Sequence, residues 1–387
     1  MHYLDHNATS PLRPECLSAV THALAVSGNP SSVHANGRAA RAIVEDARAK
    51  VAALAGAAAD AVIFTSGATE SNNLALFGAV EGSLEGESSR ITRIFVSAIE
   101  HSSVLATAAR LAERFAWIRV SHLPATADGV IDLEALRVAL REGKGRALVA
   151  VMAANNETGT VQPIAQVSKL VREAGALLLV DAVPAAGKTE IDFSYCDYMT
   201  LSAHKIGGPQ GVGALLVRDR MPLAPQLAGG GQQKGLRAGS ENLSGIAGFG
   251  AAAHALDDGA GERARMAHLR DHFEAALKAA VPEAGFFGDK VERLCSTSAF
   301  AIPGLAAETA LIGLDLDGVM MSSGSTCSSG KVAVSHVLAA MGVEDKLAAC
   351  ALRASFGWSS SMEDVIAAVE SLLKLRQRAP HPREVAA

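Results

Sequence analysis

The sequence lacks the cysteine pattern of a disulfide framework or a zinc site. Its five cysteines lie at positions 16, 196, 295, 327 and 350, so their number is odd and no CxxC pair occurs. Structural disulfides and zinc centres both need cysteines paired at suitable spacing. We therefore expect free thiols, no bound metal and a reducing compartment such as the cytoplasm.

Basic clusters and long apolar runs are also missing. The 35 Lys and Arg residues are spread along the chain against 40 Asp and Glu, for a formal net charge of -5, so nothing favours nucleic acid as a partner. No run of about 18 apolar residues indicates a membrane span. The first residues, MHYLDHNATSPL, lack the cationic and apolar parts of a signal peptide. We expect a cytoplasmic protein that acts on a small molecule, with neither nucleic acid nor membrane as a partner.

Aromatic residues are scarce, at 4%, but hydrophobic residues make up 49% of the 387 positions, which is typical of a globular protein. This length predicts one large domain and a smaller one. Helical segments at 38–55 and 163–175 alternate with short apolar runs, which predicts an α/β domain with a mostly parallel sheet. The runs are 61–66, 93–100, 147–154, 176–182, 197–203 and 211–217. The alanine-rich stretch 245–281 predicts one long helix leading into a second α/β domain.

Two ionisable residues follow neighbouring apolar runs. Asp181 closes ALLLVD, and Lys205 lies in TLSAHKIGGPQ with Ser202 and His204 beside it. Ligands of such sheets bind at the carboxyl ends of the strands, so both side chains are expected at one site. Lysine forms Schiff bases with carbonyl cofactors, and pyridoxal phosphate also needs a carboxylate at its pyridine nitrogen. Either residue alone would more simply be a helix cap or a surface charge, but the pair favours a pyridoxal phosphate site.

The segment TSGATESNNLAL, residues 65–76, runs from a strand end through a turn of small residues into a helix. The backbone N–H groups of Gly67, Ala68 and Thr69 and the Thr69 hydroxyl could hold a phosphate at the positive end of that helix. An ordinary Ser/Thr helix cap explains the segment equally well. The spacing fits neither a Walker loop nor GxGxxG, so a nucleotide site is not favoured.

Three further polar residues and one thiol are candidates for the site. His101 follows a strand in AIEHSSVL, where an imidazole can stack on a cofactor ring or move protons. Asn156 and Arg353 could bind a substrate carboxylate, although each alone would more often be structural. Cys327 lies in SSGSTCSSG, whose nine residues include no bulky side chain. A flexible segment of this length spans about 15 Å, so its thiol could reach a buried site and then an external acceptor.

These motifs, with YLDHNATSPL at 3–12, resemble those of the cysteine desulfurases, fold-type I pyridoxal phosphate enzymes of the class V aminotransferase superfamily. The similarity extends to LRASFGW at 352–358, nearly the whole chain. It implies a large cofactor-binding domain at 15–255 with a mostly parallel seven-stranded sheet. It further implies a smaller α/β domain formed by 1–14 and 256–387, which carries the cysteine loop. The long Ser/Gly loop resembles the branch that serves nitrogen fixation and general iron–sulfur assembly.

The resemblance also implies roles for the cofactor residues. Lys205 would hold pyridoxal phosphate, Asp181 would pair with its ring nitrogen, and His101 would stack on the ring. The residues that would bind its phosphate are Ala68, Thr69, Ser202 and His204. In family dimers a hydroxyl from the partner subunit completes this phosphate site, and Ser240 stands where threonine is more usual.

The implied reaction converts L-cysteine to L-alanine. Asn156 and Arg353 would bind the substrate carboxylate, and Cys327 would take the sulfur as a persulfide. The chain would act as a homodimer and pass this sulfur to an iron–sulfur scaffold or another acceptor protein. Alternatives are a selenocysteine lyase, another class V aminotransferase-like enzyme, or a non-catalytic sulfur-relay protein.

One position departs from the family pattern. Pro184, in VDAVPAAGK, stands where the family normally has a glutamine that donates to the phenolic oxygen of the cofactor. Proline offers neither a side-chain donor nor a backbone N–H. We therefore expect this contact to be absent or replaced, at a cost of about 1.5–3 kcal/mol, without loss of cofactor binding.

Overall fold

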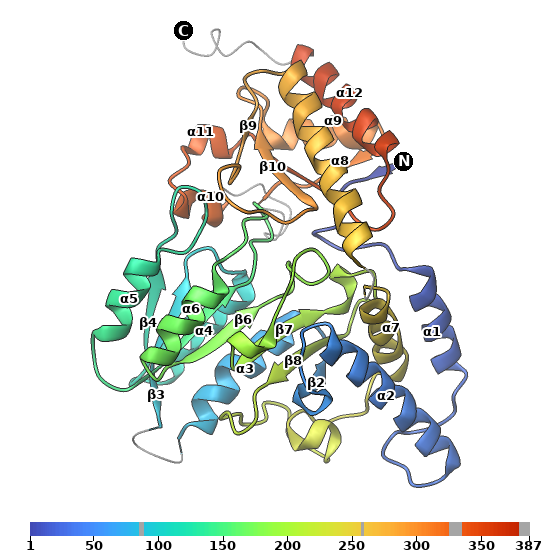
Figure 1. Cartoon of the computed structure of the whole chain (residues 1–387), viewed down its shortest axis with the longest axis vertical. Helices are drawn as coiled ribbons and strands as arrows, with labels where there is room; N and C mark the ends of the chain where they lie inside the picture. The colour runs from blue at the N-terminus through green and yellow to red at the C-terminus, as the bar shows by residue number, and fades with distance from the viewer. Residues whose placement is uncertain (85–88, 257–258, 325–334, 379–387) are drawn as a thin grey trace.

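The computed structural model describes residues 1–84, 89–256, 259–324 and 335–378. Its centre is a seven-stranded sheet (Figure 1). The strands lie in the order β2 (Val62–Thr65), β8 (Gly213–Val217), β7 (Tyr198–Ser202), β6 (Leu177–Asp181), β5 (Arg146–Met152), β3 (Ile91–Ser97) and β4 (Arg119–Leu123). β8 is antiparallel to both of its neighbours and the other pairs are parallel. The expected mostly parallel, seven-stranded sheet is confirmed.

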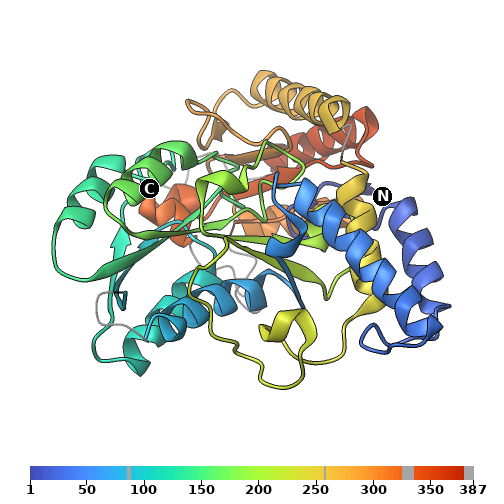
Figure 2. The ribbon, with the colours of Figure 1, turned by 60° about the horizontal axis from the view of Figure 1, so that its bottom comes forward.

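Helices cover both faces of this sheet (Figure 2). Along β5, Leu148 and Ala150 belong to one apolar cluster whereas Val149 and Val151 belong to another, because successive side chains of a strand point to opposite faces. The first cluster includes α3 (Ala68–Gly82) and α4 (Ser102–Arg114). The second includes α1 (Pro14–Leu24), α2 (Ala35–Ala53), α5 (Leu133–Arg141), α6 (Ile164–Glu173) and α7 (Leu243–His254). This burial on both faces explains why the strands are nearly continuous apolar runs.

The C-terminal part of the chain has its own sheet and core. Its three antiparallel strands lie in the order β12 (Ala351–Ser355), β10 (Thr297–Ala301) and β9 (Gly285–Phe286). The helices of this part are α8 (Gly259–Ala280), α9 (Ala307–Leu316), α10 (His336–Ala340), α11 (Asp345–Ala348) and α12 (Met362–Arg378). Its core contains Phe273 stacked edge-on against Phe300 and Phe356. β1 (His2–Tyr3) pairs in parallel with β11 (Val319–Met320), so the start of the chain lies beside its C-terminal part.

The long helix expected at 245–281 is instead two helices, α7 and α8. α7 ends at His254 and α8 begins at Gly259, which directly follows Asp257 and Asp258 in the sequence. Aspartate and glycine are poor helix formers in a helix interior, so this composition accounts for the break. None of the described helices is long and apolar enough to cross a membrane.

The strand directions bring several polar residues to one edge of the large sheet. β2, β7, β6, β5 and β3 point the same way, because the single antiparallel strand β8 lies between β2 and β7. Thr65, Asp181 and Ser202 therefore end their strands at the same edge, which is where ligands of such sheets bind.

Candidate active site

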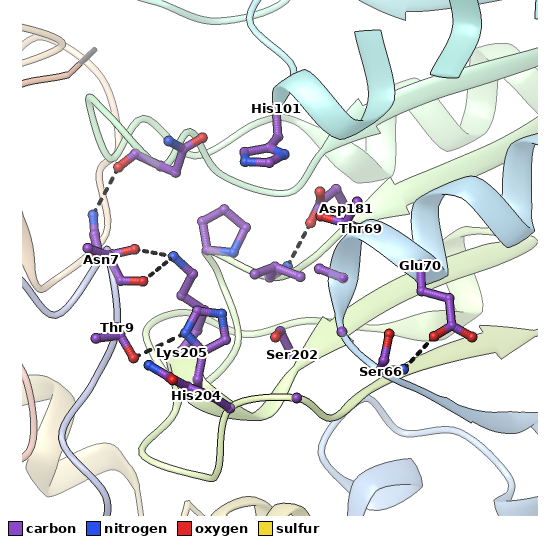
Figure 3. Close-up of a pocket in the computed structure, with 18 of the residues that line it drawn as sticks. Asn7, Thr9, Ser66, Thr69, Glu70, His101, Asp181, Ser202, His204 and Lys205 are labelled. Carbon is purple, nitrogen blue, oxygen red and sulfur yellow. Dashed lines mark hydrogen bonds between the residues drawn. The ribbon is translucent and has the colours of Figure 1, made fainter. Parts of the chain in front are cut away.

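A cavity of about 650 Å³ opens at this edge of the sheet (Figure 3). Its wall combines the turns after the strands with the N-terminal segment 7–9 and with Gly324 and Arg353 from the C-terminal part. Nine of the residues predicted for the site line it, namely Ala68, Thr69, His101, Asn156, Asp181, Ser202, His204, Lys205 and Arg353. The fold thus brings together side chains that the sequence placed on six separate motifs.

Lys205 lies in a short 3-10 turn, Ala203–Lys205, directly after β7. Its Nζ donates to the main-chain oxygen of Asn7 and, at 2.9 Å, to that of Ala8. Figure 3 shows this amine held at the side of the cavity formed by the N-terminal segment. The contact with Asn7 was not predicted, because nothing in the sequence links positions so far apart.

Asp181 is the last residue of β6 and is only 4% exposed. One carboxylate oxygen accepts from Asn72 Nδ2 at 2.9 Å and the other from the Val183 amide at 3.0 Å. Asn72 lies on α3 and also donates to Ser103 Oγ at 2.9 Å. The carboxylate is therefore held in a fixed orientation on the wall of the cavity by two donors, neither of which neutralises its charge.

His101 caps the start of α4. Its Nδ1 accepts from the Ser103 amide at 3.1 Å, so the neutral ring carries its proton on Nε2. Burial is the main cause that lowers the pKa of His101; nearby Asp181 acts in the opposite direction and Lys205 lowers it further. The imidazole is therefore uncharged at neutral pH and is one wall of the cavity in Figure 3.

His204 precedes the lysine and lies 3.2 Å, through Nδ1, from Thr9 Oγ1. Burial and the charges of Lys205 and Lys188 lower its pKa to about 4. At neutral pH this ring is a neutral hydrogen-bonding group, which suits it to contact a bound anion without adding charge.

The start of α3 is shaped to accept an anion. Gly67, the residue before the helix, has φ 154°, which residues with a side chain rarely adopt, and a Cβ there would meet open space. Gly213 of β8 approaches it so closely that a Cβ on Gly213 would lie 2.7 Å from Gly67 Cα. The Ser66 amide is held by Glu70 Oε2 at 2.8 Å. Ala68 and Thr69 then face the cavity at the positive end of a 15-residue helix.

Arg353 of β12 reaches the cavity from the C-terminal part and is 5% exposed. It donates to the main-chain oxygen of Asn156 at 2.9 Å and to Asp5 Oδ1 at 2.8 Å. Within the described residues its buried Nε has no hydrogen-bond partner. A guanidinium held in this way retains donors suited to a carboxylate.

One predicted residue stands apart from this cavity, and another is not described by the structure. Ser240 is exposed and does not line the cavity of its own chain. Its loop is tied to α3 through Arg237, which donates to Glu70 Oε1 at 2.8 Å. Cys327 lies outside the described residues.

Sequence reasoning missed three residues of this site: Asn7, Asn72 and Lys188. Asn7 and Lys188 line the cavity, and Asn72 orients Asp181. Asn7 and Asn72 lie in motifs whose other residues were predicted for the site, and Lys188 lies four positions after Pro184. None of the three ends a strand, which was the signal used to find the other residues. Among the described residues, no group of three or more His, Cys, Asp or Glu is placed to hold a metal ion.

Comparison with known proteins gives a consistent result. The sequence profile of the family described as "Aminotransferase class-V" matches residues 2–367. The chain is 42% identical to a protein of Cereibacter sphaeroides named "Cysteine desulfurase", over 93% of this chain and 92% of that protein. It is 40% identical to the "IscS-like cysteine desulfurase" of Mycobacterium tuberculosis, over 96% and 95%.

Solved structures of similar proteins share the fold. A structure titled "NIFS-LIKE PROTEIN" superposes with a TM-score of 0.89 at 32% identity, covering 98% of this chain and all (100%) of that chain. The NifS-like protein of Rickettsia africae gives 0.87 at 32% identity, covering 97% and 99%. The resemblance inferred from the motifs is therefore confirmed, and the chain belongs to the pyridoxal phosphate-dependent class V aminotransferase family and, within it, to the cysteine desulfurases.

Proposed function

We propose that this chain binds pyridoxal phosphate through Lys205, converts L-cysteine to L-alanine and takes the sulfur as a persulfide on Cys327. The observation that carries the proposal is that Asp181 at the end of β6 and Lys205 in the turn after the adjacent strand β7 line one cavity with the positive end of α3. An amine, a fixed carboxylate and an anion-binding helix end are the three groups that this cofactor requires. The family membership and the desulfurase relatives support the same reading.

The residues present fit the cofactor. The Lys205 amine would bond to its aldehyde carbon, the Asp181 carboxylate would pair with its ring nitrogen, and His101 would lie against the ring. Its phosphate would be held at the start of α3 by Ala68 and Thr69, together with the side chains of Ser202 and His204. When bound, the cofactor supplies an electron sink for the carbon from which a proton leaves.

The side chains of this chain would carry the remaining steps. Arg353 and Asn156 would orient the carboxylate of L-cysteine, and the Lys205 amine would take the proton from its α-carbon. The Cys327 thiolate would then attack the substrate sulfur as the carbon–sulfur bond breaks and the carbon retains the electron pair. Protonation of that carbon, together with return of the proton from the Lys205 amine to the α-carbon, gives alanine and leaves one sulfur atom added to Cys327. An iron–sulfur scaffold or another acceptor protein would remove this sulfur.

The exposed position of Ser240 supports a homodimer. Because this hydroxyl does not line the cavity of its own chain, we assign it to the phosphate site of a second copy. A nucleophilic thiol must also stay reduced between turnovers, which is consistent with a cytoplasmic location.

The purified protein tests the proposal directly. We expect visible absorption from a bound cofactor and, after addition of L-cysteine with a reductant, equal yields of alanine and sulfide. Bound cofactor without either product would favour another substrate, with L-selenocysteine tested first. Absence of any cofactor would favour a sulfur-relay protein.

Pro184 provides a separate prediction, because it lines the cavity in the turn after Asp181. We expect Pro184→Gln to introduce a donor to the phenolic oxygen of the cofactor. A hydrogen bond to a charged oxygen is worth about 1.5–3 kcal/mol, so the pH midpoint of the cofactor absorption should fall by about one to two units. A pH titration of the absorption spectrum measures this shift.

The exposed Pro282, on the turn after α8, provides the control. Pro282→Gln should leave the midpoint unchanged, since it lies outside the cavity. An unchanged midpoint in Pro184→Gln as well would mean that a side chain at position 184 does not reach the cofactor.

A further inference from the structure

Lys188 is a second lysine on the wall of the cavity, and the mechanism above does not use it. It ends the turn 183–188 after β6 and is only 7% exposed. Its Nζ donates to Asn7 Oδ1 at 2.9 Å, and the described residues offer it no ion pair with a carboxylate. Buried lysines are rare and normally paired. Burial, together with the charge of Lys205, lowers the pKa of Lys188 to about 7.

Asn7 connects this amine to the reacting one. Its side-chain oxygen accepts from Lys188, and its main-chain oxygen accepts from Lys205, a contact that Figure 3 shows. Asn7 Nδ2 donates to the main-chain oxygen of Asn156 at 3.1 Å and to Thr297 Oγ1 at 3.0 Å. One asparagine therefore holds both amines in place while it is itself fixed by the large and the C-terminal parts of the chain.

Other ionisable groups surround the two amines. Arg353 lowers and Cys295 raises the pKa of Lys188. The charge of Lys188 in turn helps lower the pKa of His6 to about 3 and that of His204 to about 4. Among the residues that the structure describes, the ionisable side chains on the cavity wall besides the two lysines are Glu70, His101, Asp181, His204 and Arg353.

We propose that Lys188 is a positioning residue for Lys205: it fixes Asn7, and in its protonated form it weakens the affinity of the Lys205 amine for a proton. This inference rests on the proposed role of Lys205 as the cofactor lysine. An amine beside another cationic group is easier to deprotonate and is thereby activated as a nucleophile and base. The structure gives Lys205 such a neighbour, linked to it by a single shared residue.

Three substitutions separate the charge of Lys188 from its hydrogen bond. Lys188→Met removes both, Lys188→Gln keeps a donor for Asn7, and Lys188→Arg keeps the charge. The measurement is a pH titration of the bound cofactor's absorption in each variant. We expect the midpoint to rise by about one pH unit in the Met and Gln variants, and to stay near the wild-type value in the Arg variant. Lys169→Met, on the exposed side of α6, is the control and should not shift it.

A second measurement needs no cofactor. The full chain, stripped of any bound cofactor, is acetylated across a range of pH, and modification of Lys205 is quantified by mass spectrometry. We expect a wild-type midpoint well below the ordinary lysine value of about 10.4, and a higher one in Lys188→Gln. This assay remains decisive if Lys188→Met does not fold, because the wild-type midpoint alone carries a prediction.

The outcomes separate the two proposals. The role of Lys188 would be overturned if the absorption midpoint were the same in wild type and in the Met and Gln variants. It would also be overturned if Lys205 of wild type were acetylated with an ordinary lysine midpoint. Either result would leave the desulfurase proposal intact. If wild type instead failed to take up cofactor while the acetylation midpoint of Lys205 still shifted in Lys188→Gln, the proposed function would be overturned. The coupling of the two amines would then still hold.

Discussion

Cys327→Ala is expected to lower the formation of both alanine and sulfide from L-cysteine by about 1000-fold or more, while the absorption of the bound cofactor stays unchanged. The thiolate is the proposed acceptor of the substrate sulfur. Without it, no nucleophile attacks that sulfur to break the carbon–sulfur bond. The cofactor should remain, because its proposed contacts lie on the large sheet, at the ends of β2, β6 and β7. Product analysis alongside an absorption spectrum tests both statements on one sample.

Cys16→Ala is a suitable control. Cys16 is fully buried in α1, and burial raises the pKa of its thiol to about 11, so almost none of it is thiolate at neutral pH. This variant should turn over like wild type. Mass spectrometry after one turnover should find one added sulfur atom on the peptide that contains Cys327. Equal yields of alanine and sulfide from Cys327→Ala would contradict the persulfide proposal and indicate direct release of sulfur, as expected of a lyase.

The sequence predicted the residues that end strands. Asp181 and Ser202 follow apolar runs directly, and Lys205 comes one short turn later. Once a parallel sheet is inferred, its geometry places their side chains at one edge. The fold class could be predicted for the same reason, because continuous apolar runs separated by amphipathic helices leave few other arrangements.

The network behind these residues could not be predicted in this way. Asn7 contacts Lys205, 198 positions away, because β1 pairs with β11 and carries the first residues across to the large sheet. Asn72 reaches Asp181 only because α3 packs against the sheet. Such contacts depend on tertiary packing, which local periodicity does not encode. Ser240 is a related case, since its proposed site lies on a second copy of the chain.

The protonation states of the cavity's side chains also could not be predicted from the sequence, because they depend on burial and on neighbouring charges in the fold. His204 was expected to bind phosphate, and its pKa of about 4 results from burial and two nearby lysines rather than from any local motif. The cavity thus combines uncharged imidazoles and two crowded amines with the fixed carboxylate of Asp181. An amine in such surroundings is disposed to act as a nucleophile and base rather than as a permanent cation.

Lys205→Ala is expected to remove both the attachment of the cofactor and the proton transfer at the α-carbon. Proton transfer by a positioned base is worth about 100- to 10,000-fold, and loss of the covalent attachment adds to this, so turnover should fall by at least about 1000-fold. The absorption of the bound cofactor should change, and gel filtration should release it more readily than from wild type. A small exogenous amine should restore part of the activity, because it can replace the missing base.

Lys205→Arg is the matched control for the architecture of the site. Arginine keeps a cation that can donate to the main-chain oxygens of Asn7 and Ala8, as Lys205 does, but it cannot be deprotonated at working pH. It should therefore fold like wild type, measured by thermal unfolding, and be as inactive as Lys205→Ala. If either variant kept more than about a tenth of wild-type turnover, the reduction expected from losing a general base would be absent. Lys205 would then serve only to bind the N-terminal segment, and Lys188 would be the next amine to test.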